Sequence, residues 1–123
     1  MYYLTVKTHF AAAHRLINYD GDCENLHGHN WRVEATVSAR RLDAAGLGID
    51  FKVLKKTTNQ ILDTFDHKYV NEVPPFDEIS PSSENMAAYI FDRLKERLNN
   101  DNVQVFEIKV WESDNACAIY RED

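Results

Sequence analysis

The chain has 123 residues, of which 44% are hydrophobic and 28% charged, with only four glycines and three prolines. This composition is typical of a folded domain and excludes a collagen-like or disordered chain; the length suits one core, so we expect a single domain over residues 1–123. The formal net charge of −6, without a run of lysine and arginine, argues against nucleic acid and anionic membranes as partners.

Alternation of apolar and polar residues predicts two strands in the first third of the chain. The first begins at Leu4, and its inward parity holds Leu4, Val6, Phe10, Ala12 and His14. The second is the clearest in the sequence, with Trp31, Val33, Ala35, Val37 and Ala39 on one parity. His27 and His29 share the inward parity of this second strand.

The period then becomes helical. Asp50 is expected to cap a helix whose apolar stripe is Phe51, Leu54, Thr58, Ile61, Leu62 and Phe65. A second helix follows Pro81 and Ser83, with the stripe Met86, Ala87, Ile90, Phe91, Leu94 and Leu98. Residues 66–82 between the helices are expected to form a long loop, and loops of that length are usually functional or mobile.

Two short strands, 103–111 and 116–120, are predicted at the end of the chain, joined by the polar turn 113–115. The order strand, strand, helix, helix, strand, strand predicts an α+β fold with an antiparallel sheet. The edges of so small a sheet would be exposed in a monomer. We therefore expect the sheet to continue into neighbouring subunits of a ring-like homo-oligomer.

The sequence from Met1 to Lys7 lacks the basic start and apolar stretch of a secretion signal, and no segment approaches membrane-spanning length. We expect a cytoplasmic protein that contacts no membrane. In a reducing cytosol, Cys23 and Cys117 are expected to be free thiols. Cys117 lies between two alanines in a predicted strand, where a small buried hydrophobic residue is expected.

Three histidines give the strongest chemical signal. His27 and His29 flank Gly28 at the start of the second strand, where residues two apart project to the same side. His14, on the inward parity of the first strand, can supply a third nitrogen if the two strands are neighbours. Three histidines with an open fourth position are typical of catalytic zinc, so we predict a zinc site at these residues. His9 lies on the polar parity and is expected at the surface.

Cys23 lies four residues before His27 in a polar loop, and two interpretations stay open. It can be a reactive thiol beside the metal. Alternatively, it can be a fourth ligand that closes a structural zinc site, in which case the chain is a binding module without turnover. Glu112 shares the parity of Phe106, Ile108 and Val110, so its carboxylate is expected to turn inward, where it needs a partner.

Motifs that span nearly the whole chain resemble a known family. They are residues 10–16, residues 23–29, Asp66-His67, residues 81–85, and Trp111-Glu112 with residues 118–121. Together they resemble the 6-pyruvoyl-tetrahydropterin synthase superfamily, and within it the 6-carboxytetrahydropterin synthases of the queuosine pathway.

The resemblance implies the tunnelling fold, in which subunits join their sheets into a barrel, usually as a homohexamer with active sites at subunit interfaces. It also implies a zinc-dependent lyase that converts 7,8-dihydroneopterin triphosphate into 6-carboxy-5,6,7,8-tetrahydropterin, with loss of triphosphate and acetaldehyde. Cys23 matches the family's proton-transferring cysteine, and Asp66 and His67 match its relay partners. Glu112 matches the glutamate that anchors the pterin, and Ser83 stands near the implied pterin pocket.

One feature departs from the family pattern, because Glu24 directly follows Cys23. A related group uses glutamate in the cysteine's role and is thought to make 6-hydroxymethyl-7,8-dihydropterin for folate synthesis. That cleavage, with Glu24 as the catalytic carboxylate, is therefore an alternative reaction. Formation of 6-pyruvoyl-tetrahydropterin is another.

Overall fold

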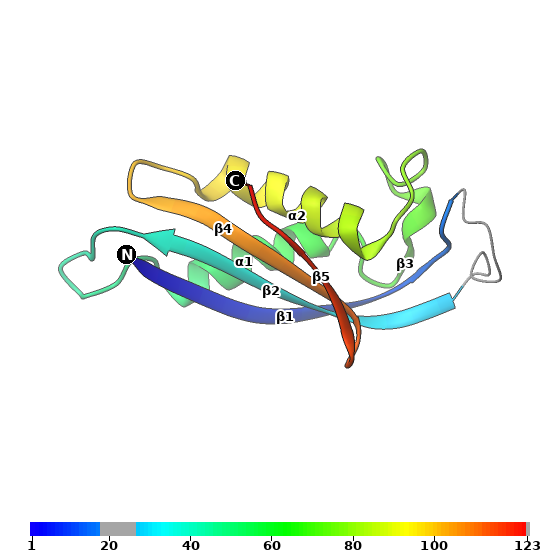
Figure 1. The fold of residues 1–123 in the computed structure, drawn as a ribbon, viewed down its shortest axis with the longest axis horizontal. Coiled ribbons are helices and arrows are strands. Elements are labelled where there is room, and N and C mark those ends of the chain that lie inside the picture. The colour runs from blue at the N-terminus through cyan, green and yellow to red at the C-terminus, as the bar shows by residue number, and fades with distance from the viewer. Residues whose placement is uncertain (18–26, 123) are drawn as a thin grey trace.

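The computed structural model describes residues 1–17 and 27–122, apart from the side chain of His27. In chain order the elements are β1 (Tyr2–His14), β2 (His27–Ala39), α1 (Phe51–Leu62), β3 (Lys68–Tyr69), the 3-10 helix η2 (Val70–Glu72), α2 (Ser83–Leu98), β4 (Val103–Ser113) and β5 (Ala116–Tyr120). The strands form one sheet in the order β3-β1-β2-β4-β5, and both helices lie along one face of it (Figure 1). The predicted α+β class is confirmed.

The long hairpin of β1 and β2 satisfies the condition that the histidine prediction required. The two strands pair antiparallel over their whole length, with His14 opposite His27 and Ala12 opposite His29. On its other side β2 pairs antiparallel with β4, and Arg32 lies opposite Trp111. Consequently β2 is the central strand, and the ends of β1 and β4 lie on either side of its start.

A β-bulge interrupts the pairing of β2 with β4. Thr36 lies opposite Glu107, but the next residue, Val37, lies opposite Val105, so β4 has one extra residue at this point. Such an extra residue shifts the alternation of a strand by one position. The buried residues of β4 are accordingly odd-numbered before the bulge and even-numbered beyond Glu107, as at Ile108 and Val110. The expected inward parity is therefore wrong at Phe106, the extra residue of the bulge, whose ring packs against Tyr3 with centroids 4.8 Å apart.

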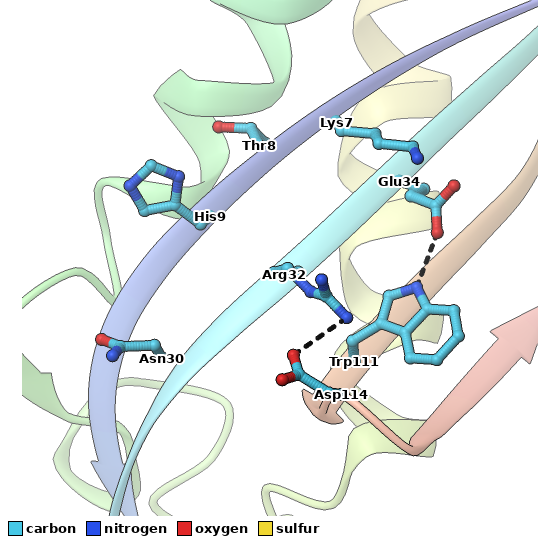
Figure 2. A pocket seen from close by; sticks show the side chains of 8 residues that line it. All are labelled: Lys7, Thr8, His9, Asn30, Arg32, Glu34, Trp111 and Asp114. Atoms are coloured by element: carbon cyan, nitrogen blue, oxygen red, sulfur yellow. Dashed lines mark hydrogen bonds and ion pairs between the residues drawn. The ribbon is translucent and has the colours of Figure 1, made fainter.

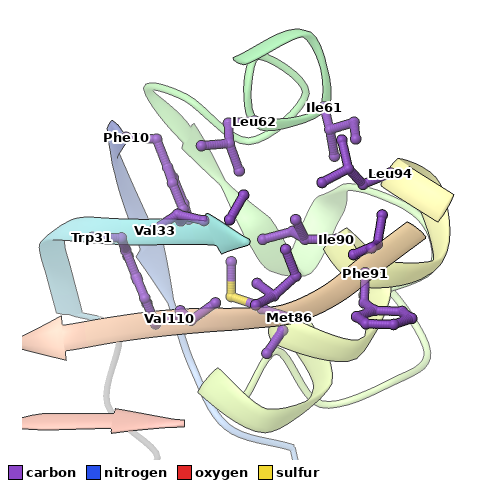
Figure 3. Close-up of a cluster of buried hydrophobic side chains, with 14 of the residues drawn as sticks. Phe10, Trp31, Val33, Ile61, Leu62, Met86, Ile90, Phe91, Leu94 and Val110 are labelled. Carbon is purple, nitrogen blue, oxygen red and sulfur yellow. The ribbon is translucent and has the colours of Figure 1, made fainter. Parts of the chain in front are cut away.

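The core lies between the sheet and the two helices. The inner face of the sheet meets the apolar stripes of α1 and α2, and Figure 3 shows these side chains gathered in one cluster. Trp31 is fully buried in it and stacks on Phe10 with ring centroids 5.8 Å apart. The cap of α1 is as expected, because Asp50 accepts from the Lys52 amide. At the start of α2, Ser82 accepts from the Asn85 amide.

The prediction for Phe51 is wrong, because this residue is 53% exposed. The buried residues of α1 are Leu54, Thr58, Ile61 and Leu62. At about 100° per residue, Phe51 lies on the same side of α1 as these residues, between the directions of Thr58 and Leu62, but it is the first residue of the helix. Helical spacing gave the direction of the side chain and not which end of the stripe the core covers.

Two further expectations need correction. Residues 66–82 do not form only a loop, since β3 pairs in parallel with β1 and η2 follows it. A strand of two residues is too short to produce an alternating pattern. Cys117 is exposed, not buried. The alternation of β5 turns Tyr120 towards the Phe91 ring of α2, with centroids 5.1 Å apart, and therefore turns Cys117 outward.

Within residues 1–17 and 27–122, no helix is both long enough and apolar enough to cross a membrane.

The contribution of the core to stability can be tested at Ile90, which is fully buried in α2. We expect Ile90→Ala to lower the free energy of unfolding by about 2–5 kcal/mol, because it removes apolar contacts and leaves a cavity. The measurement is urea unfolding followed by circular dichroism. Val53→Ala, at a position in α1 that is 49% exposed, is the control and should change stability by less than about 0.5 kcal/mol. Equal effects of the two changes would contradict the assigned core.

Candidate metal centre

Three side chains converge where the paired strands β1, β2 and β4 lie next to one another. His14 is the last residue of β1, His29 lies near the start of β2, and Glu112 lies near the end of β4. One potential ligand atom from each lies within 4.8 Å of the others. His14 is 1% exposed and Glu112 is 37% exposed, so the cluster has a buried side and an open side.

Strand alternation and an aromatic floor position the two imidazoles. His14 follows the inward residues Phe10 and Ala12, and His29 precedes the inward residue Trp31 by two positions. The Trp31 ring lies edge-on to both, with centroids 4.7 Å from His14 and 5.5 Å from His29. The Trp31 indole N–H donates to the carbonyl of Ala12 at 3.3 Å, which fixes the orientation of this floor.

The hydrogen bond between His14 and Pro81 determines which nitrogen of His14 faces the cluster. Nδ1 lies 2.8 Å from the Pro81 carbonyl oxygen, and because a carbonyl only accepts, Nδ1 carries the proton. In a neutral ring, Nε2 then presents a lone pair. This atom lies 3.3 Å from Oε1 of Glu112. A carboxylate oxygen and an unprotonated nitrogen repel each other, so the contact requires either a proton shared between Nε2 and Oε1 or a bound cation.

The donor set suits a divalent cation. Nε2 of His29 lies 3.1 Å from the same Oε1 of Glu112, so two imidazoles and a carboxylate oxygen surround one small region. Imidazole and carboxylate are common zinc ligands. A ligating histidine typically donates its other ring N–H to a carbonyl, as His14 does here. The three residues therefore fit a metal site.

The residues at the start of α2, Pro81 to Ser83, contact the cluster at two points. The Pro81 carbonyl holds His14, and the hydroxyl of Ser83, the first residue of α2, donates to Oε2 of Glu112 at 3.5 Å. Ser83 is itself buried. The predicted site residue Ser83 thus lies against Glu112, although it makes no described contact with a histidine.

The structure groups the predicted residues differently from the sequence analysis in one respect. His14 and His29 are together as expected, and Glu112, which the resemblance assigned to the pterin and not to the metal, lies against both of them. The shared inward parity was visible in the sequence. The pairing of β2 with β4, which brings Glu112 close, was not. The backbone of His27 is opposite His14, but its side chain, together with Cys23 and Glu24, lies outside the described residues.

Asp66 and His67 lie beside β1 at Ala11. Oδ1 of Asp66 accepts from the Ala11 amide at 3.0 Å, and the His67 amide donates to the Ala11 carbonyl at 2.6 Å. Ala11 precedes His14 by three residues, which corresponds to about 10 Å along a strand. Apart from the bond of the Asp66 amide to the Leu62 carbonyl, their described hydrogen bonds and ion pair are thus with Ala11 and with each other. Within one chain, this pair is separate from the cluster of His14, His29 and Glu112.

Asp66 and His67 form an ion pair in which the carboxylate is held by the backbone and the imidazole is exposed. The hydrogen bond from the Ala11 amide, followed by the charge and hydrogen bond of His67, holds the pKa of Asp66 below its usual value. His67 has φ 58°, in the left-handed region that is uncommon outside glycine. Its ring is 82% exposed, with Nδ1 3.0 Å from Oδ1 of Asp66. Asp66 therefore stays ionised and orients an imidazole that faces outward.

A separate cavity of about 660 Å³ lies over the face of the sheet that the helices leave open, and Figure 2 shows its lining. The indole N–H of Trp111 donates to Glu34 at 2.6 Å, and Arg32 lies 3.4 Å from Asp114. His9 also lines it, and is exposed as the sequence predicted. The cations and carboxylates here neutralise each other, and the lining contains none of the predicted site residues.

Comparison with known proteins gives consistent matches. The model of the 6-pyruvoyl tetrahydropterin synthase family matches residues 3–123. A 6-pyruvoyl tetrahydrobiopterin synthase of Homo sapiens is 33% identical over 126 residues, covering 91% of this chain and 86% of that protein. A 6-carboxy-5,6,7,8-tetrahydropterin synthase of Synechocystis sp. is 38% identical over 92 residues, covering 71% of this chain and 70% of that protein.

The fold gives the same result. The solved structure of Caenorhabditis elegans 6-pyruvoyl tetrahydropterin synthase has a TM-score of 0.84 and 27% identity, covering 100% of this chain and 98% of that chain. The single chain therefore has the fold that the sequence resemblance implied. Its sequence is similar to synthases named for two different products.

The metal centre can be tested at its two described imidazoles. We expect His14→Ala and His29→Ala each to lose most of the divalent metal bound by the purified protein, because each removes a nitrogen ligand. Metal content is measured by elemental analysis after dialysis. His9→Ala removes an exposed histidine of β1 on the opposite parity and should leave the metal content unchanged. Full metal content in both single variants would refute the assignment.

Proposed function

The chain belongs to the 6-pyruvoyl tetrahydropterin synthase family, and we propose that it is a zinc-dependent 6-carboxytetrahydropterin synthase. Its substrate would be 7,8-dihydroneopterin triphosphate, and its products 6-carboxy-5,6,7,8-tetrahydropterin, triphosphate and acetaldehyde, a step towards 7-deazapurines such as queuosine. The observation that carries the proposal is the convergence of His14, His29 and Glu112 at one partly open site. The 38% identity to a synthase of that name supports this product.

The zinc ion would be held by His14 and His29, with His27 as the third ligand expected from the sequence. When bound, zinc acidifies hydroxyl groups and polarises the neighbouring carbon atoms, so that a modest base can remove a proton. The hydrogen bond of Nδ1 of His14 to Pro81 keeps Nε2 aimed into the site. Trp31, packed against both rings, excludes water from the buried side.

Glu112 would hold the pterin ring. A pterin offers its 2-amino group and the N3–H as adjacent donors, and a carboxylate can accept both, one at each oxygen. Glu112 is 37% exposed, so a ring can reach it from the open side of the site. Ser83, within 3.5 Å of Oε2, limits where the carboxylate can move.

Proton transfer would rest on Cys23 together with Asp66 and His67. The latter pair lies beside Ala11 in the same chain, about 10 Å along β1 from His14, with the imidazole exposed. An outward-facing relay pair can serve the site of a neighbouring subunit. We therefore include in the proposal a homohexamer in which Asp66 and His67 of one subunit complete the site of the next.

Formation of 6-pyruvoyl-tetrahydropterin is the second candidate function. The specific observation in its favour is the human relative, which is named for that product and is matched over 91% of this chain. Both reactions begin with the same substrate and would use the same metal and ring contacts. They differ in whether the side chain of the pterin is cleaved.

Identification of the product by mass spectrometry, after incubation of the zinc protein with 7,8-dihydroneopterin triphosphate, tests the proposed reaction directly. We expect Cys23→Ala to keep zinc and lower formation of 6-carboxytetrahydropterin by a factor of about 100 or more, because the variant lacks the proton-transferring thiol. Glu24→Ala is the adjacent control and should change the rate little.

The same two variants distinguish the folate-type reaction. If Cys23→Ala still makes 6-hydroxymethyl-7,8-dihydropterin and Glu24→Ala abolishes that product, the carboxylate is the catalytic group. Normal 6-carboxytetrahydropterin synthesis by Cys23→Ala would overturn the role of the thiol and leave the metal centre in place.

Ring binding is tested separately at Glu112. We expect Glu112→Gln to weaken pterin binding by about 2–4 kcal/mol, because the amide accepts only one of the two ring donors and carries no charge. Calorimetric titration with a pterin measures this. Glu107→Gln changes a carboxylate of the same strand whose partner is Arg121, and it should bind pterin normally. Unchanged affinity in folded Glu112→Gln protein would remove the anchor role.

A further inference from the structure

The two carboxylate oxygens of Glu112 have different surroundings. Oε1 lies 3.3 Å from Nε2 of His14 and 3.1 Å from Nε2 of His29, while Oε2 lies 3.5 Å from the hydroxyl of Ser83. A bidentate contact with a pterin needs both oxygens turned towards the two ring donors. In the described position, Oε1 instead faces the two imidazoles. The carboxylate therefore cannot hold a pterin ring in this way without moving.

The distances around Oε1 match a metal coordination shell. Zinc binds imidazole nitrogen and carboxylate oxygen at about 2.0–2.2 Å, so two ligand atoms in a tetrahedral arrangement lie about 3.3–3.5 Å apart. The two nitrogen–oxygen distances of 3.3 Å and 3.1 Å are close to this spacing. Because Nδ1 of His14 bonds the Pro81 carbonyl, Nε2 is the ring nitrogen that faces Oε1 and is placed to share a metal ion with it.

We infer that Glu112 ligates the metal through Oε1 in the substrate-free protein and releases it when a pterin ring binds. The carboxylate then alternates between two positions: beside His14 and His29 when the site is free, and on the ring donors when it is filled. Release leaves a coordination position open only while a pterin is bound. The second half of this inference rests on the proposed function, because it requires a ligand with adjacent N–H donors.

The exchange makes metal binding and ring binding antagonistic through one side chain. A pterin that draws Glu112 away weakens the metal site, and the metal must weaken pterin binding by the same factor, since coupling between two ligands is reciprocal. Glu112 can move because it is 37% exposed and lies one residue before the end of β4. His14, which is 1% exposed and bonded to Pro81, stays in place.

The resting ligand is tested with Co²⁺, whose visible absorption reports the ligands around it. We expect Glu112→Ala to change the Co²⁺ spectrum and to raise the Co²⁺ dissociation constant by about tenfold or more. Glu112→Gln keeps the side-chain volume without the charge and should be intermediate. Glu107→Gln, on the same strand, should match the wild type in both measurements. Wild-type spectrum and affinity in Glu112→Ala protein would overturn ligation by Glu112.

The exchange is tested by adding unsubstituted pterin, whose ring carries the donors but no hydroxylated side chain that could reach the metal. In the wild-type Co²⁺ protein we expect the spectrum to shift to that of Glu112→Ala and the Co²⁺ affinity to fall by about tenfold, with the reciprocal loss of pterin affinity. The Glu112→Ala spectrum should not respond.

Two results would overturn the exchange: a wild-type spectrum that bound pterin leaves unchanged, or a protein that binds no pterin. The second result would also contradict the proposed function. Failure to convert 7,8-dihydroneopterin triphosphate, with the spectral shift intact, would refute the proposed reaction alone and support the exchange.

Discussion

The pairing of β2 with a neighbour on each side is the constraint on which the site depends. β1 contributes His14, β2 contributes His29 and β4 contributes Glu112, so three segments far apart in the chain meet only if both registers are correct. A slip of one residue in either pairing would turn the affected side chain to the opposite face of the sheet. The core specifies these registers, because each strand must also bury its apolar residues against α1 and α2.

The start of α2 links this sheet geometry to the polar contacts of the site. The carbonyl of Pro81 orients His14, and the hydroxyl of Ser83 contacts Glu112, while Ser82 caps the helix. The same short segment therefore ends a loop, begins a helix and positions two site residues. The buried stripe of α2 holds this segment against the sheet. A change in the packing of α2 would therefore move Pro81 and Ser83, and with them the hydrogen bonds to His14 and Glu112.

The sequence predicted those features of the fold that depend on the periodicity of a single strand or helix. The alternation in β1 and β2 and the stripe of α2 were legible because each element buries one face along its own length. The cap of α1 at Asp50 was legible from its residue type and position. The two-residue strand β3, the exposure of Cys117 and the approach of Glu112 to the histidines depend on which strands pair and which lie at an edge. These are long-range relations, and no window of sequence contains them.

The bulge opposite Thr36 and Val37 gives β4 two phases of alternation, one on each side of Phe106. The N-terminal phase directs Val103 and Val105 into the core, and the C-terminal phase directs Ile108 and Val110 inward together with Glu112. Removing the extra residue at the bulge would merge the two phases into one regular alternation and leave Glu112 on the inner face. Removing one residue beyond the bulge, such as Lys109, would instead turn the large indole of Trp111 towards the histidines and the carboxylate to the opposite side. The chemistry of this site thus depends on the number of residues in β4 as much as on their identity, so a deletion that preserves every functional residue would still abolish it.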